Sequence, residues 1–82
     1  MKLSIIIVSY NAKHHLQFCL ESCVNATKNL EAEILVIDNN SPDNVVAYLQ
    51  PLFSSVKFFQ LEENLGFAKA NNFGVQQANG EF

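Results

Sequence analysis

The sequence contains little of what several large classes of protein require. It has no tryptophan, only 3 glycines and 2 prolines, and no apolar run close to the roughly 20 residues that cross a bilayer. The apolar stretch after Lys2 ends at Ser9, which is too soon for a signal peptide. Acidic side chains outnumber basic ones by 8 to 5, so the formal net charge is -3. This balance argues against a nucleic-acid-binding surface, which is normally basic.

Signature motifs of two classes of nucleotide-binding enzyme are also missing. The sequence has neither the Gly-x-Gly-x-x-Gly fingerprint of dehydrogenases nor the Gly-Lys-Ser/Thr of a phosphate loop. No nucleophile–base pair can be assigned. Glu62 and Glu63 do not make a catalytic pair of carboxylates, because their side chains would diverge on an extended segment. We therefore predict no catalytic residue within this chain.

The two cysteines, Cys19 and Cys23, lie four residues apart on a predicted helix. Their side chains would point the same way, which suits packing better than a disulfide. We predict two buried free thiols in a reducing compartment. A metal site with His15 is the alternative, but the sequence offers no second pair of ligands at zinc-like spacing.

Three apolar runs, each followed by a polar cluster, are the most informative feature that is present. The runs are residues 5–8, 34–37 and 56–61. The clusters are Ser9-Tyr10-Asn11, Asp38-Asn39-Asn40-Ser41 and Glu62-Glu63-Asn64-Leu65-Gly66. A helix-like segment follows each cluster. Since parallel strands end at one edge of the sheet, where α/β folds bind ligands, the clusters predict the rim of one site.

The hydrophobic pattern alternates between strand and helix. Strands are predicted at residues 3–9, 33–38 and 56–61, the first two buried on both faces and the third nearer an edge. Helices are predicted at residues 12–26, 41–50 and 66–78. With right-handed crossovers, this order gives an α/β fold, a three-layer Rossmann-like parallel sheet in the order β-α-β-α-β-α. It forms a single domain over residues 1–82, and residues 80–82 look like the start of a fourth strand.

Local signals place the helix ends. Asn11 is the predicted N-cap of the first helix, and Ser41 the N-cap of the second. The third helix has a small buried face, predicted to contain Phe67, Ala70, Gly74 and Ala78, with Val75 beside them. Glycine in a helix interior costs about 1 kcal/mol relative to alanine, so Gly74 predicts close approach to the sheet.

Several side chains at the predicted rim are candidates for ligand contact. Asp38 can accept hydrogen bonds from a ribose or a base, or it can cap the turn with Asn39 and Asn40; its position leaves both open. Tyr10 can stack on a base, or it can be a partly buried aromatic of the sheet rim. Asn11 can cap the helix, contact the ligand, or do both.

The third cluster suggests a place for phosphate. Asn64 and Gly66 precede the third helix, where glycine allows close approach of the backbone and a helix N-terminus favours anions. Lys69 can meet a diphosphate, or it can be solvated. Asn72 is a poor helix former in mid-helix, which suggests a specific hydrogen bond.

Taken together, four segments resemble the beginning of a family 2 glycosyltransferase. They are Ser4 to Asn11, Cys19 to Ser22, Ile37 to Asp43 and Asn64 to Gly74. The resemblance implies a GT-A fold, of which this chain is the N-terminal nucleotide-binding part. It also implies a nucleotide-diphospho-sugar donor, Mg²⁺ or Mn²⁺, and inversion at the anomeric carbon. The Asp-Asn-Asn-Ser and Asn-Leu-Gly-Phe-Ala segments resemble the rhamnosyltransferase-like branch more than cellulose or chitin synthases.

The resemblance also assigns roles to individual residues. Ser9 and Tyr10 would line the base pocket, and Asp38 and Asn39 would contact the base or the ribose. Many members carry a second acid where this chain has Asn39, and that acid reads uracil. With Asn39 in place of that acid, the expected donor is a UDP-sugar or a sugar on another nucleotide, such as a dTDP-sugar. Many members also carry an arginine where this chain has Asn71, which weakens the case for a diphosphate contact there.

The metal-binding Asp-x-Asp motif and the general base of the family would both follow Phe82. We therefore expect this truncated donor-binding domain to be inactive alone, with no metal ligands of its own. The expected acceptor is a glycan or lipid-linked molecule, and the expected location is the cytoplasm, at the inner face of the membrane. The alternatives are a non-catalytic α/β nucleotide-binding or regulatory module, and a structural fragment that self-associates through its open sheet edge.

Overall fold

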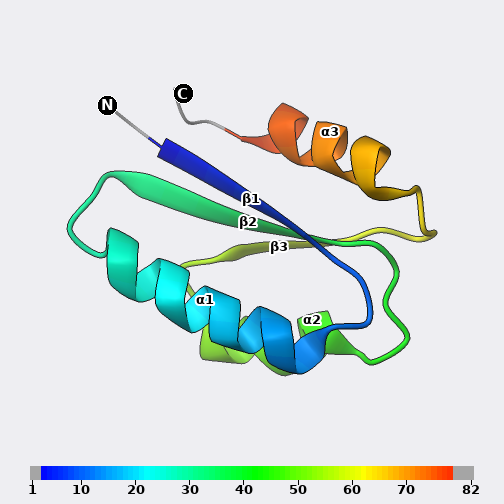
Figure 1. Ribbon diagram of the computed structural model, residues 1–82, viewed down its shortest axis with the longest axis horizontal. Helices are drawn as coiled ribbons and strands as arrows, with labels where there is room; N and C mark the ends of the chain where they lie inside the picture. Colours follow the sequence, from blue (N-terminus) through cyan, green and yellow to red (C-terminus); the bar gives the residue numbers. More distant parts are fainter. Residues whose placement is uncertain (1–2, 79–82) are drawn as a thin grey trace.

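The computed structural model describes residues 3–78, which form a parallel sheet with helices on both faces (Figure 1). The strands are β1 (Leu3–Ser9), β2 (Ala32–Asp38) and β3 (Lys57–Gln60), in the order β1-β2-β3. Both strand pairs are parallel, and the register aligns Ser9 with Asp38 and Asp38 with Gln60. The three carboxyl ends therefore lie at one edge, which confirms the predicted α/β sheet.

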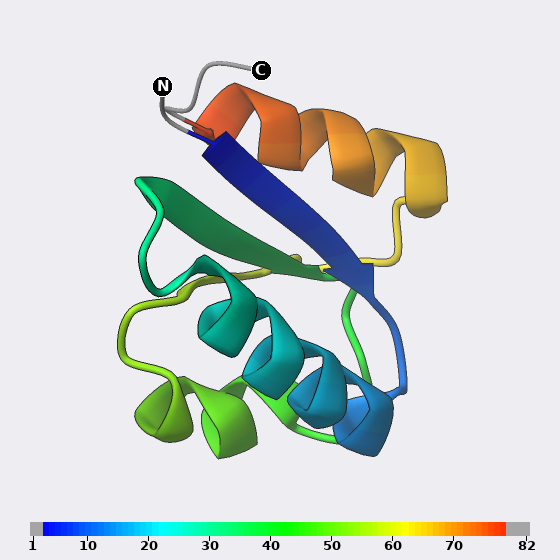
Figure 2. The same cartoon turned by 60° about the vertical axis from the view of Figure 1, so that its left-hand side comes forward.

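The helices lie in two layers. They are α1 (Lys13–Thr27), α2 (Val45–Leu49), the 3₁₀ helix η1 (Gln50–Leu52) and α3 (Phe67–Gln77). Helices α1 and α2 cover one face of the sheet and α3 covers the other (Figures 1 and 2). Within residues 3–78, no helix combines the length and the apolar composition that crossing a membrane requires.

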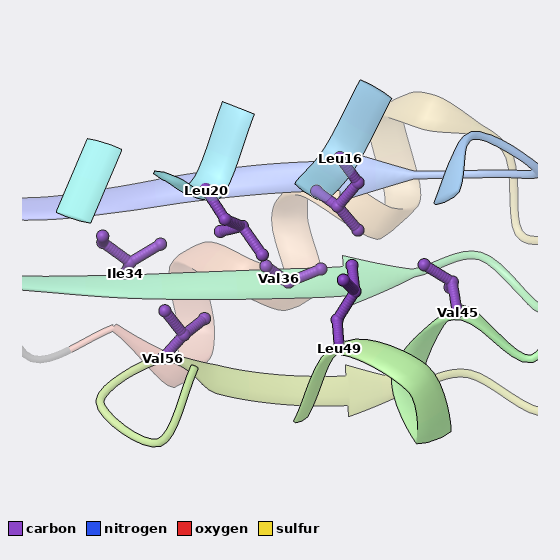
Figure 3. Close-up of a cluster of buried hydrophobic side chains, with 7 residues drawn as sticks. All are labelled: Leu16, Leu20, Ile34, Val36, Val45, Leu49 and Val56. Atoms are coloured by element: carbon purple, nitrogen blue, oxygen red, sulfur yellow. The ribbon is translucent and has the colours of Figure 1, made fainter. Parts of the chain in front are cut away.

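The main core lies between β2 and the α1–α2 layer. Its buried side chains are Leu16, Leu20, Ile34, Val36, Val45, Leu49 and Val56 (Figure 3). Fully burying a valine, leucine or isoleucine side chain contributes about 1.5–3 kcal/mol. Strand β2 supplies the centre of this core because it is the middle strand and is buried along nearly its whole length.

Strand β1 departs from the expectation that it is buried on both faces. Its residues from Ser4 to Val8 are only partly buried, because within the described residues β1 pairs on one side alone, with β2. The third strand lies at an edge, as predicted. The predicted start of a fourth strand at residues 80–82 lies outside the described residues.

Helix α3 packs against the sheet through very small residues. Ala70 and Gly74 are buried, as predicted. A Cβ atom on Gly74 would lie 2.5 Å from Cγ2 of Ile6, so the helix can approach β1 this closely only with glycine there. Phe73 packs edge-on against Phe59 of β3, with ring centroids 5.6 Å apart. The prediction was wrong for Phe67, which is 68% exposed, and Val75 is 50% exposed.

The two cysteines also differ from expectation. Cys19 is exposed and Cys23 is partly buried, and both are free thiols. The buried face of α1 is set by Leu16 and Leu20, and Cys19 lies to the side of that stripe. The prediction of two buried thiols was therefore wrong for Cys19.

A second polar cluster joins the strands near their amino ends. The carboxylate of Glu33 accepts a hydrogen bond from the Ser4 hydroxyl at 2.6 Å and an ion-paired one from Lys57 at 2.9 Å. Glu33 is 8% exposed. These contacts pair a nearly buried charge, as burial of a carboxylate requires. They hold the register of β1, β2 and β3 at the edge opposite the predicted site.

The close approach at Gly74 predicts the effect of a methyl group there. Gly74→Ala should lower the free energy of unfolding by about 1–2 kcal/mol, because the overpacking cost outweighs the helix propensity gained. Denaturant unfolding measures this. Gln76→Ala, at an exposed position of the same helix, should change stability by less than about 0.5 kcal/mol. An equally stable or more stable Gly74→Ala protein would contradict the packing described.

Candidate functional site at the carboxyl edge of the sheet

The end of β2 is the centre of the site. The backbone N–H of Asn39 donates to the Ser9 carbonyl at 2.8 Å, and the N–H of Leu61 donates to the Asp38 carbonyl at 2.9 Å. These bonds extend the strand pairing beyond the sheet on both sides. Asp38 is 1% exposed and Asn39 4% exposed. The dipeptide that was predicted to contact a ligand is thus a buried junction of the three strand ends.

Both carboxylate oxygens of Asp38 are held by one residue. Oδ2 accepts from the Ser41 N–H at 3.0 Å, and Oδ1 accepts from the Ser41 hydroxyl. This is an Asx-type turn, in which a carboxylate accepts hydrogen bonds from the backbone N–H and the hydroxyl of a residue shortly after it in the chain. Of the two roles left open by the sequence, the structure shows turn capping. Ligand contact by Asp38 stays a prediction.

Ser41 also connects this turn to the loop after β1. Its Oγ accepts a hydrogen bond from the Asn11 N–H at 2.8 Å. Asn11 has a φ of 51°, a left-handed conformation in which asparagine is several-fold enriched. The predicted N-cap roles are therefore wrong for both residues. The N-cap of α1 is Ala12, and α2 begins at Val45, beyond the turn that holds Ser41.

The N-terminus of α1 is stabilised from another loop instead. Oδ2 of Asp43 accepts a hydrogen bond from the Lys13 N–H at 3.2 Å. A carboxylate there interacts favourably with the helix dipole. Asp43 comes two residues after Ser41, the predicted N-cap of the second helix, and local spacing cannot show that its carboxylate faces the helix before it.

The loop after β3 is attached through side-chain amides. Oδ1 of Asn39 accepts from the Leu65 N–H at 2.8 Å, and Oδ1 of Asn64 accepts from the Gly66 N–H at 2.9 Å. Gly66 has a φ of 83°, and a Cβ there would meet no atom within 4 Å. Glycine is therefore required by backbone conformation rather than by space. The three loops are joined into one rim.

The N-terminus of α3 lies at this rim with free donors. Gly66 is the N-cap, and no side chain caps the helix. The N–H groups of its first residues have no partner within the helix, as at any helix start. Lys69 lies exposed in this first turn. Asn72 is exposed and lies about 9 Å beyond Gly66 along the helix axis. It takes no part in the rim contacts described above.

Two residues of the loop after β1 offer groups to a ligand. Tyr10 is 51% exposed. Ser9 is 5% exposed, and its Oγ is one of two buried side-chain oxygens without a hydrogen-bond partner in the part of the chain that the structure describes; Asp43 Oδ1 is the other. Ser9 borders a cavity of about 180 Å³ between β1 and α1. A buried hydroxyl without a partner is a group that a ligand or water can satisfy.

The expected divalent cation does not fit the acidic residues of the rim. Both oxygens of Asp38 face Ser41, and across residues 3–78 no group of three His, Cys, Asp or Glu side chains is arranged to hold a metal ion. We therefore assign no metal ligand to this rim.

Because Ser41 bonds to both Asp38 and Asn11, removal of its hydroxyl oxygen should lower the stability of the chain. Ser41→Ala leaves the buried Asp38 carboxylate and the Asn11 N–H each without a partner, which should lower the free energy of unfolding by about 1–3 kcal/mol. Chemical denaturation measures the change. Ser54→Ala, at an exposed position, should stay within about 0.5 kcal/mol of the parent. Equal stabilities of the two variants would show that Ser41 does not hold the loops.

Comparison with known proteins places this geometry in a family. Residues 4–82 match the family model described as Glycosyl transferase family 2. The chain is 34% identical over 83 residues to a dolichol-phosphate mannosyltransferase of Pyrococcus furiosus, covering 99% of this chain and 24% of that protein. It is 26% identical over 80 residues to a teichoic acid poly(glycerol phosphate) polymerase of Staphylococcus epidermidis, covering 93% of this chain and 11% of that protein.

A solved structure agrees with the fold. The crystal structure of S. aureus TarS superposes with a TM-score of 0.81 and 31% sequence identity, covering 99% of this chain and 15% of that one. The chain thus spans about a quarter of the length of the first of these relatives and less of the other two. The family match, the relatives and the shared α/β architecture agree: this chain belongs to glycosyl transferase family 2.

Proposed function

We propose that this chain forms the donor-binding part of an inverting glycosyltransferase. The enzyme would transfer a sugar from a UDP- or dTDP-sugar to a glycan or lipid-linked acceptor. One observation carries the proposal: in a member of this family, three strand-end loops are hydrogen-bonded into a single rim at the carboxyl edge of a parallel sheet. Parallel α/β sheets bind nucleotides at this edge.

The base is proposed to lie against the loop after β1. Tyr10 is exposed enough to present a ring face, and base–aromatic stacking contributes about 1–3 kcal/mol per base. Beside it in the sequence, Ser9 has a buried hydroxyl free to hydrogen bond. Asn11 is held in place through its N–H, so its exposed side chain is available to the ligand.

Asp38 and Asn39 act mainly by fixing the rim. Oδ1 of Asn39 accepts from the Leu65 N–H, and the amide nitrogen, which can only donate, is the group proposed to meet a ligand. An acid at this position would offer an acceptor instead. A donor at this position suits the carbonyl oxygens of uracil and thymine alike, which is why both nucleotides stay in the proposal.

The diphosphate is proposed to lie at the start of α3. The unpaired N–H groups after Gly66 and the positive end of the helix dipole favour an anion. Asn64 fixes the backbone that leads into this turn, and Lys69 lies exposed within it. Asn72 would contribute only if the ligand extends along α3.

The reaction itself depends on groups that we do not assign to this chain. A divalent cation, when bound, neutralises the charge that develops on the departing diphosphate, and a general base activates the acceptor hydroxyl. The contribution of the described residues is to bind and orient the donor. We propose that the enzyme works in the cytoplasm at the inner face of the membrane and that it belongs to the rhamnosyltransferase-like branch.

Nucleotide titration tests this proposal. Adding UDP or dTDP to the isotope-labelled chain should shift the NMR signals of Tyr10, Asn11 and Gly66 in a saturable manner. Tyr10→Ala should weaken binding by roughly tenfold or more, because a stacking partner worth about 1–3 kcal/mol is lost.

Phe18→Ala is the matched control. Phe18 is an exposed aromatic on α1, and its removal should leave the dissociation constant within about twofold, in line with the small effects of most surface substitutions. A folded chain whose spectrum does not respond to either nucleotide would overturn the proposal. So would saturable shifts confined to the amino edge of the sheet, near Glu33.

A further inference from the structure

The two thiols of α1 form a pair that the donor site does not use. Cys19 is exposed, Cys23 is partly buried, and neither is in a disulfide. They lie one helical turn apart on α1, close enough for the Cys19 thiol to raise the pKa of the Cys23 thiol. Cys23 packs against the edge of the core and Cys19 is exposed, so the pair joins one accessible thiol to one that is partly covered.

The helix holds the Cβ atoms of the pair too far apart for an unstrained disulfide. Residues at i and i+4 have Cβ atoms about 5–6 Å apart, whereas a disulfide needs about 3.5–4.5 Å. Closing a disulfide would therefore distort α1. A single atom bonded to both sulfurs spans the remaining gap without unwinding the helix.

The surroundings leave room for such an atom and its substituent. Cys19 lines the cavity of about 180 Å³ that Ser9 also borders, and Cys23 lies one helical turn beyond Cys19 on α1. His15 does not complete a metal site with the thiols, since no three-ligand group exists within residues 3–78. The bound atom must therefore need only two sulfur ligands from the protein, and any further substituent must already be bonded to it.

We propose that Cys19 and Cys23 form a two-thiol binding site for a soft, thiophilic centre with two positions open to sulfur. Soft thiolate ligands select such centres over harder ions. A monosubstituted trivalent arsenical, phenylarsine oxide, is the matching probe. Its As=O group condenses with two S–H groups, forming two As–S bonds and one water molecule. Arsenic stays trivalent, so no oxidant or reductant is needed.

The environment of the pair should slow alkylation of Cys23. Burial raises the pKa of the Cys23 thiol, and the neighbouring Cys19 thiol raises it further. Near neutral pH less Cys23 is therefore thiolate, the form that attacks alkylating reagents. Condensation with an arsenical starts from two neutral thiols. At pH 7, iodoacetamide should modify Cys23 more slowly in the native chain than in a denatured chain. Phenylarsine oxide should react with both thiols of the native chain.

The test compares the folded chain with two single variants. Intact mass spectrometry should show one phenylarsenic per chain with loss of both free thiols, and the adduct should survive an excess of a monothiol competitor. Cys19→Ser and Cys23→Ser keep the fold, as circular dichroism can verify, but leave one thiol. Each variant should retain the probe at least about 100-fold less well, because it can form only one As–S bond and lacks the second, intramolecular one.

Two results would overturn the proposal. One is retention of the probe by either single variant at the parental level, which would show that the thiols act separately. The other is a folded parent chain that releases the probe as readily as the variants, which would show that α1 holds the sulfurs out of reach of one another. Neither result bears on nucleotide binding, which does not depend on this pair.

Discussion

The structure depends on how the buried dipeptide Asp38-Asn39 ends β2. Its backbone bonds to both neighbouring strand ends, through the Ser9 carbonyl and the Leu61 N–H. Its side chains accept from Ser41 and Leu65, one in each adjoining loop. A polar group buried without partners costs about 1–3 kcal/mol, so each of these groups requires its partner to stay in place. The rim of the candidate site is therefore fixed before any ligand arrives.

Packing on the two faces of the sheet supports that junction in different ways. The α1–α2 layer buries large aliphatic side chains against β2, whereas α3 lies close to β1 and β2 through Ala70 and Gly74. Because α3 is held against the sheet by close contact, its N-terminus is brought to the carboxyl edge next to Gly66. The proposed diphosphate position thus follows from the small size of Ala70 and Gly74, which lie about one and two turns farther along the helix.

The strands, α1, α3 and the shared rim could be predicted because they depend on periodic apolar patterns and on the geometry of parallel sheets. The contacts within the rim could not. Ser41 and Asn11 carry ordinary N-cap signals, but their partners are each other and Asp38, from loops about 30 positions apart. Asp43 likewise serves the helix before it. Local spacing cannot show which of several possible acceptors a folded loop will bring near. The exposure of Cys19 was missed because an apolar stripe defines only the centre of a buried face.

Amide hydrogen exchange at the rim tests the central claim most directly. The N–H groups of Asn11, Ser41 and Leu65 lie outside regular secondary structure, and each donates to a side chain. The account predicts that all three exchange slowly, with protection approaching that of β2 amides such as Val36, because opening any of them breaks the junction. Exchange as fast as in a freely solvated loop would mean that the three strand ends are not joined, and the site described here would not exist as one rim.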